Sequence, residues 1–97
     1  MHHNFAEIAR QAKPLTLAIA RRLLPQGRVE GHEYVALNPK RADSGLGSFK
    51  INIITGKWAD FATGDKGGDV IALYAYLANT SQLQALAAVA QLLGRPL

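Results

Sequence analysis

Residues 57–69 read KWADFATGDKGGD and decide how the strands of this chain meet its helices. The stretch combines an aromatic strand end, a polar turn and two glycines ahead of an apolar run, which predicts a strand-to-helix junction. Asp69 stands at the expected N-cap of the helix, where its carboxylate would accept hydrogen bonds from backbone N–H groups. We interpret Gly67 and Gly68 as a tight turn with unusual backbone angles, and a phosphate contact at the helix start is the second interpretation.

Two hairpins are expected on the N-terminal side of this junction. In residues 49–53 apolar and polar side chains alternate, which predicts a half-buried strand. A Thr-Gly turn returns this strand into residues 57–61. Residues 28–30 and 33–37 form a smaller hairpin pattern around a Gly-His turn. The strands are therefore expected to form a small antiparallel sheet.

Helical patterns flank the strands on both sides. Asn4 and Glu7 have the spacing of a capping box ahead of a helix expected over residues 5–12. Pro14 disfavours helical geometry in the residue before it, so a second helix is expected only over residues 15–24.

The C-terminal third is almost uncharged. From residue 70 onwards Arg95 is the only charged side chain, and residues 79–81 divide the segment into two helical patterns. The first pattern is apolar nearly all round, which predicts a helix packed on more than one face. The second pattern ends at Gly94, shortly before Pro96.

This order of elements predicts an α+β fold, in which a small antiparallel sheet of two hairpins is covered by N-terminal and C-terminal helices. A chain of 97 residues with 48% hydrophobic content is long enough for one modest core, so we expect a single domain over residues 1–97. Within it we expect leading helices (1–24), two hairpins (28–61) and a helical pair (69–94).

Composition and charge narrow the classes of function. Eleven Lys and Arg residues against seven Asp and Glu give a net charge of +4, which favours polyanionic partners. The lack of cysteine excludes disulfides and thiolate metal sites and is typical of a reducing compartment. The longest apolar run, residues 70–78, is about half of a membrane span, and no signal-peptide pattern is present. We therefore expect a cytoplasmic protein that does not associate with a membrane.

Several short motifs follow one another in a set order. The first is NPKR at residues 38–41, and the second is the Ser-Phe pair of residues 48 and 49, which leads the next strand. The third is residues 60–64, at the end of the second hairpin, and the fourth is the Lys-Gly-Gly of residues 66–68, which opens a helix. This order resembles the N-terminal template-recognition domain of bacterial, phage and plasmid DNA primases, which is normally a zinc ribbon. In that family a Cys-Pro-x-His motif and a second cysteine pair stand at the first and third of these places. The chain looks close to the cysteine-free version found at the front of primase-helicases of plasmids, phages and integrated elements.

The similarity spans residues 34–94, and all four zinc ligands of the family are replaced in this chain. Structural zinc takes four Cys or His ligands, and the one internal candidate is His32, which we interpret as a turn residue. We interpret the carboxylates of Asp43, Asp60 and Asp65 as solvated loop groups. No metal and no other cofactor is expected, so the core is expected to be zinc-ribbon-like without zinc.

Losing the zinc ion removes a stabilising free energy on the order of 10 kcal/mol. The expected replacements are a larger core formed by the uncharged helices and a cover of aromatic side chains, namely Tyr34, Phe49, Trp58 and Phe61. For Trp58 we weigh core packing against stacking on a nucleobase, and both alternatives stay open.

Five cations lie on or next to the expected hairpins: Lys40, Arg41, Lys50, Lys57 and Lys66. Lys50 points away from the core because its strand neighbours are apolar. Together with Trp58, these cations suit contact with the backbone of single-stranded DNA, and a solvated sheet face is the alternative.

The resemblance implies a nucleic-acid-binding module that holds single-stranded template for a primase or primase-helicase of a mobile element. The alternative is a protein-interaction module, whose uncharged C-terminal helices would dock a replicative polymerase or helicase partner. We expect no enzyme activity from the chain alone, because Asp60, Asp65 and Asp69 lack a partner histidine or a metal-binding pattern. The polymerising centre of a primase would lie on another part of a longer chain or on another chain.

Overall fold

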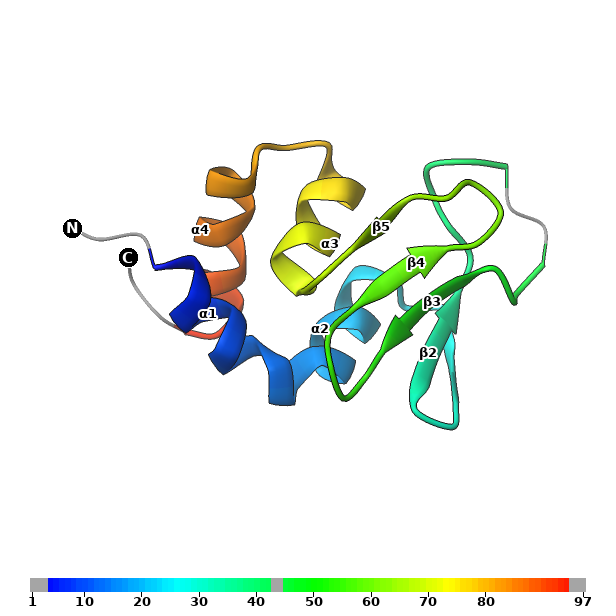
Figure 1. The fold of residues 1–97 in the computed structure, drawn as a ribbon, viewed down its shortest axis with the longest axis horizontal. Coiled ribbons are helices and arrows are strands. Elements are labelled where there is room, and N and C mark those ends of the chain that lie inside the picture. The colour runs from blue at the N-terminus through cyan, green and yellow to red at the C-terminus, as the bar shows by residue number, and fades with distance from the viewer. Residues whose placement is uncertain (1–3, 43–44, 95–97) are drawn as a thin grey trace.

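The computed structural model describes residues 4–42 and 45–94, which form helices and a sheet as an α+β fold (Figure 1). The elements follow in the order α1 (Phe5–Ala12), the 3-10 turn η1 (Lys13–Leu15), α2 (Thr16–Leu23), β1 (Arg28–Glu30), β2 (Glu33–Ala36), β3 (Phe49–Asn52), β4 (Trp58–Asp60), β5 (Lys66–Gly67), α3 (Val70–Ala78) and α4 (Gln82–Leu92). The predicted fold class is therefore confirmed.

The five strands form one antiparallel sheet in the sequential order β1-β2-β3-β4-β5. The register places Tyr34, Ile51, Trp58 and Gly67 in one row across β2 to β5. We call the face that carries this row the inner face, because its side chains pack against α2 and α3. The two predicted hairpins are β1–β2 and β3–β4. The fifth strand was not predicted, because a strand of two residues has no readable periodicity.

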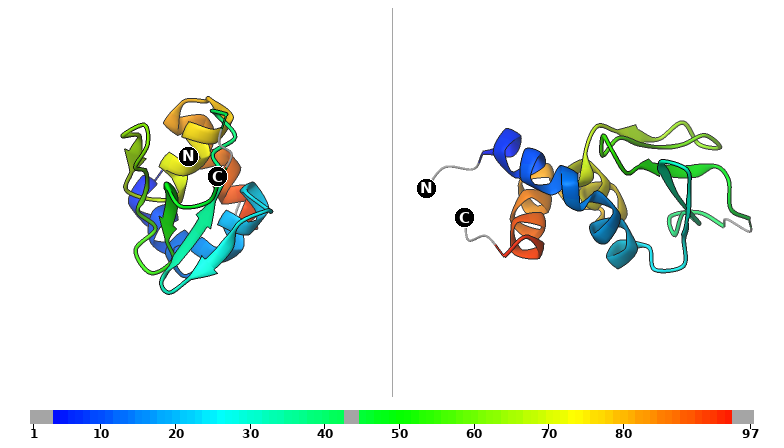
Figure 2. Two further views of the ribbon diagram at one scale, coloured as in Figure 1. Left: turned by 90° about the vertical axis from the view of Figure 1, so that its right-hand side faces the viewer. Right: turned by 90° about the horizontal axis from the view of Figure 1, so that it is seen from below.

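Helix α3 lies between α4 and the sheet, so the molecule has a helical half and a sheet half (Figure 1; Figure 2). One core cluster lies among the helices and includes Ile8, Ala12, Ile19, Val70, Ile71, Leu86 and Val89. A second cluster lies between the inner face and helices α2 and α3, and includes Ala20, Leu24, Tyr34, Phe49, Ile51, Trp58 and Leu73. Because α3 contributes to both clusters, the predicted packing on more than one of its faces is confirmed.

The leading helices continue through Pro14, whereas the sequence predicted a break at Lys13. Lys13 has φ −54° and ψ −50°, which is right-handed helical geometry. Pro14 lies near the start of η1, where its missing N–H leaves no helical hydrogen bond unmade. The hydroxyl of Thr16 donates to the Lys13 carbonyl at 2.7 Å and stabilises the turn. The tight connection lets both α1 and α2 contact α3.

The two glycines ahead of α3 do not form the predicted turn with unusual backbone angles. Neither Gly67 nor Gly68 has a positive φ, and Gly67 belongs to β5. A Cβ atom at Gly67 would lie 2.5 Å from Nε1 of Trp58, so a glycine is required there by the indole ring that packs on it. The positive φ values of this region belong to Gly56 and Gly64.

The predicted helix start at Asp69 is confirmed. Its Oδ1 accepts a hydrogen bond from the Ala72 N–H at 2.8 Å, as expected of an N-cap residue. Its carbonyl oxygen also accepts a hydrogen bond from Nε1 of Trp58 at 3.2 Å. Asp69 therefore fixes both the start of α3 and the orientation of the indole ring on β4.

Candidate nucleic-acid interface

Three of the five predicted cations lie on the outer side of the sheet. The register aligns Lys50, Ala59 and Lys66 across β3 to β5, one position away from the inner row. Because strand side chains alternate between faces, these residues point away from the helices. Lys57, two positions before Ala59, has the same parity and is exposed, as is Lys66, while Lys50 is half-buried.

Phe61 extends this outer side past the end of β4. Its backbone N–H donates to the Ser48 carbonyl at 2.8 Å, so the pairing of the two strands continues to this residue. Its side chain is 72% exposed, and its predicted place in the aromatic cover is therefore wrong. The reason is alternation, which turns Phe61 to the side opposite Trp58. We define the open face as the outer surface formed by Lys50, Lys57, Ala59, Phe61 and Lys66.

A hollow of about 210 Å³ lies on the open face, and its walls include Lys50, Lys57 and Phe61. Glu33 also lines it, with its Oε1 3.8 Å from Nζ of Lys50. Both side chains of this pair are about one third exposed, and ion pairs of this kind contribute about 0–1 kcal/mol. Within residues 4–42 and 45–94, Lys57 has no carboxylate at ion-pair distance. The hollow therefore keeps positive charge that an anion can use.

The indole ring of Trp58 packs on the inner side of the sheet, although the residue is also among those that line the hollow. Its side chain is 5% exposed and stands 6.2 Å from the ring centroid of Phe49 and 4.8 Å from that of Tyr76. The core-packing interpretation is confirmed, and almost no indole surface is left for a nucleobase. Phe61 is instead the exposed aromatic residue beside the cations, and the strand alternation in the sequence was the signal that could have identified it.

Lys40 and Arg41 also lie away from the open face. The ammonium of Lys40 donates to the Tyr76 carbonyl at 2.7 Å and stands 4.7 Å from the centroid of the Tyr76 ring. The guanidinium of Arg41 pairs with Asp60, its Nε 2.8 Å from Oδ2, and donates to the Ser48 hydroxyl. Both cations hold the loop after β2 against neighbouring elements, so the structure does not bring all five predicted cations together.

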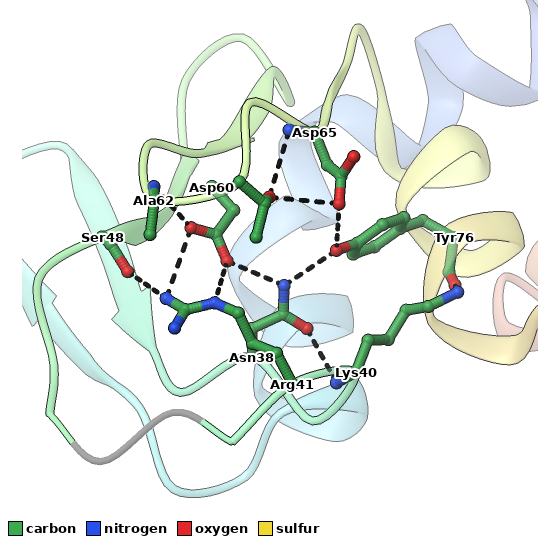
Figure 3. A network of polar contacts seen from close by, with 9 residues as sticks. Asn38, Lys40, Arg41, Ser48, Asp60, Ala62, Asp65 and Tyr76 are labelled. Carbon is green, nitrogen blue, oxygen red and sulfur yellow. Dashed lines mark hydrogen bonds and ion pairs between the residues drawn. The ribbon is translucent and has the colours of Figure 1, made fainter.

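Asp60 is fully buried, which corrects its interpretation as a solvated loop group. Its Oδ2 accepts hydrogen bonds from Nε of Arg41 and Nδ2 of Asn38, both at 2.8 Å, and its Oδ1 accepts one from the Ala62 N–H at 2.9 Å (Figure 3). Burial by itself would raise the pKa of Asp60, but the hydrogen bonds from Arg41, Asn38 and Ala62 outweigh it and hold the pKa well below its ordinary value. The carboxylate is therefore charged inside the protein.

Tyr76 connects this carboxylate site to α3. The amide of Asn38 donates to the Tyr76 hydroxyl at 2.8 Å, and the hydroxyl donates to Oδ2 of Asp65 at 2.8 Å (Figure 3). Burial raises the pKa of Tyr76, the hydrogen bond from Asn38 opposes this, and the Asp65 carboxylate reinforces it. We call Asn38, Arg41, Asp60, Asp65 and Tyr76 the polar cluster. It joins residues 38–41 to residues 60–64, the two segments that the sequence analysis aligned with zinc-ligand motifs.

The polar cluster was not predicted from the sequence, although one signal for it was present. Asp60 has the same strand parity as Trp58, which places it on the inner face, and an inward-facing carboxylate needs a charged or hydrogen-bonding partner. The identity of that partner was not readable, because Asn38 and Arg41 lie on a loop whose path depends on the fold.

No three His, Cys, Asp or Glu side chains are grouped as metal ligands within the described ranges 4–42 and 45–94. His32 is an exposed residue of the β1–β2 turn, as predicted. Asp43 lies outside the described residues. In the same ranges no helix has the length and apolar character needed to cross a lipid bilayer.

The fold and the site together define a small α+β protein with a cationic open sheet face and a polar cluster built around the buried carboxylate of Asp60. Comparison of the chain with protein-family models gave no match, and comparison with curated proteins gave no significant match. Its function is therefore inferred from its own residues.

Proposed function

We propose that this chain is a nucleic-acid-binding module whose open face contacts single-stranded DNA. The observation that carries the proposal is the position of Phe61, 72% exposed, beside Lys50 and Lys57 on one hollow. An exposed aromatic ring offers a stacking surface to any base, and neighbouring cations neutralise the phosphates on either side. A sheet face with both features suits single-stranded nucleic acid, whose bases are free to stack.

We propose further that the module serves a primase or primase-helicase of a mobile element, as the motif order implies. In such a protein the polymerising centre lies elsewhere, and this module would hold the template. The polar cluster supports the proposal in one respect. It ties together the two segments, 38–41 and 60–64, that a zinc ion joins in the family that the chain resembles. The ion pair between Arg41 and Asp60, to which Asn38 adds a hydrogen bond, would then connect the two segments in place of the metal.

Docking of a protein partner through the C-terminal helices has less support. The apolar side chains of α4 are mostly used inside the molecule, since Ala85, Leu86, Val89 and Ala90 are buried against other helices. Leu83 is the large apolar side chain of α4 that stays exposed, at 51%. A single exposed leucine is ordinary for a protein surface and does not by itself indicate an interface.

The test is a titration of a fluorescently labelled oligothymidylate with the protein at two salt concentrations. Binding through phosphates must weaken as salt rises. The double variant Lys50→Glu/Lys57→Glu should abolish binding, and Phe61→Ala should cost about 1–3 kcal/mol of binding free energy if the ring stacks on a base. The matched control is Arg21→Glu/Arg22→Glu, which makes the same charge change on α2. If the wild type binds no DNA at low salt, or if the two double variants bind equally, the proposal is wrong.

A further inference from the structure

A second concave surface, a groove, shares Lys57 with the hollow on the open face. It has a volume of about 510 Å³ and runs between α1, the β3–β4 turn and the start of α3. This volume is in the range of about 300–1,000 Å³ that ligand sites usually have. Lys57 lines both the groove and the hollow on the open face. The two concave surfaces are therefore adjacent and share one cation.

The charge of the groove is positive. Arg10 and Lys13 line it from the α1 side, and Lys57 lines it from the turn. Asp69 is the one carboxylate of its lining, and that carboxylate already accepts the N–H of Ala72 at the start of α3. In residues 4–42 and 45–94, Lys13 has no carboxylate at ion-pair distance, while Arg10 pairs with Glu7 on the surface of α1. A ligand of this groove is therefore expected to be an anion.

Gly68 gives an independent indication that the groove is kept open. It lines the groove, its φ is not positive, and a Cβ atom added to it would have no atom within 4 Å. The fold therefore does not require a glycine at this position, unlike Gly67, where the Trp58 ring leaves no room. With no side chain at this position, the wall of the groove leaves the backbone open to close approach by a ligand.

We propose that this groove binds the sugar-phosphate backbone of a nucleic-acid strand that continues past the open face. This inference rests on the proposed function and extends it. The strand would pass from Lys50 and Phe61 over Lys57, and its phosphates would then meet Lys13 and Arg10. The N-terminal helices thereby belong to the binding surface, although none of the cations predicted from the sequence as DNA contacts lies on them.

The first test removes the two cations of α1 and η1. The ligand is a labelled oligothymidylate of about 16 nucleotides, the upper end of the sites that small single-strand-binding domains cover. For single strands each phosphate contact adds about −0.7 to the slope of log K against log salt concentration. At about 0.1 M salt this corresponds to about a fivefold gain in affinity per contact, relative to about 1 M salt. The variant Arg10→Ala/Lys13→Ala should therefore bind roughly 25-fold more weakly, and its salt slope should be smaller by about 1.4.

The matched control is Arg21→Ala/Arg22→Ala, which removes two cations from α2, outside the groove lining. Its affinity should stay within about threefold of the wild type, since salt screens charges at a distance. Equal weakening by the two double variants would mean that net charge alone acts, and it would overturn the inference.

The second test obstructs the groove without changing its charge. Gly68→Gln places a long neutral side chain in the groove and should weaken DNA binding at least tenfold, whereas the methyl group of Gly68→Ala should weaken it less. Thermal unfolding of both variants should match the wild type, because a Cβ atom at this position meets nothing. If Gly68→Gln is folded and binds DNA normally, the groove is not a binding site.

The outcomes for the groove and for the open face are separable. Lys50 lines the hollow of the open face but not the groove, so Lys50→Glu reports on the open face alone. If Lys50→Glu weakens binding while the groove variants bind normally, the proposed function stands and the groove inference fails. If the wild type binds no single strand at low salt, both fail.

Discussion

Asp60 carries its negative charge inside the protein because donors surround its carboxylate. A charge without partners would be very unfavourable there, and here Arg41, Asn38 and the Ala62 N–H share its two oxygens. The arrangement connects a loop, a strand end and, through Tyr76, a helix. Its effect on stability therefore depends on all partners being present, and removing Asp60 takes a charged acceptor from Arg41 and from Asn38.

Asp60→Asn tests this dependence directly. The amide has the shape of the carboxylate but no charge, so Arg41 loses its ion pair with this side chain. Breaking a buried pair costs about 3–5 kcal/mol, and because the Arg41 side chain is 26% exposed we expect about 3 kcal/mol in urea unfolding. Asp65→Asn, which changes an exposed carboxylate of the polar cluster, should cost less than about 1 kcal/mol. Equal losses of unfolding free energy for the two variants would contradict the special role of Asp60.

The lowered pKa of Asp60 also predicts how stability depends on pH. In the unfolded chain this carboxyl titrates near its ordinary pKa of 3.8, and in the folded protein it titrates well below that value. The unfolded state therefore binds the proton more tightly, so the contribution of Asp60 is fully present above about pH 5 and decreases as pH falls below the ordinary pKa. The unfolding free energy should fall more steeply from pH 5 to pH 2 in the wild type than in Asp60→Asn. Parallel curves would contradict the lowered pKa.

At the scale of single elements, the junction of β5 and α3 gives a matched pair of substitutions. Gly67→Ala places a Cβ atom 2.5 Å from Nε1 of Trp58, and that ring is held by its hydrogen bond to Asp69. Overpacking of this kind costs about 1–3 kcal/mol. Gly68→Ala meets no atom and should change the unfolding free energy by less than about 0.5 kcal/mol. Thermal or urea unfolding measures both variants, and similar stabilities would show that the indole ring moves aside.

The sequence predicted most elements because their signals are local. Alternation identified β3, the Thr-Gly turn after it identified β4, and the capping residues Asn4 and Asp69 marked helix starts that the structure confirms. The reason for Gly67 was not predictable, since it depends on an indole ring nine residues earlier that reaches it only across the sheet. Helical geometry at Lys13 was also missed, because the general preference of residues before proline gives way here to a 3-10 turn.

The candidate site was predictable only in part. Lys50 and Lys57 were placed correctly on one surface by strand parity and turn position. The same parity rule assigns Phe61 to that surface and Asp60 to the interior, but residue type suggested the reverse for both. An exposed phenylalanine and a buried aspartate each oppose the general preference of their residue type, and such exceptions often mark functional or structural sites.

At the scale of the whole molecule, stability should not depend on a metal ion. The polar cluster connects residues 38–41 to residues 60–64 without one. We expect that excess EDTA leaves the melting temperature unchanged and that elemental analysis of the purified protein finds no stoichiometric zinc. One zinc per chain, or a lower melting temperature with EDTA, would contradict this expectation.

The leading helices line one side of the groove, and we expect that they are also needed to keep the protein soluble. Ile8, Ala12 and Ile19 pack in the helical core cluster, and Ala20 and Leu24 pack against the inner face of the sheet. Deleting residues 1–24 would expose the apolar side chains of α3 and α4 that these residues cover, and an exposed apolar surface of this kind promotes association. Light scattering of residues 25–97 should therefore detect aggregates at concentrations where the full chain is monodisperse. A soluble, monomeric truncation would show that the sheet and the C-terminal helices fold independently, and the helical core cluster would then not be essential.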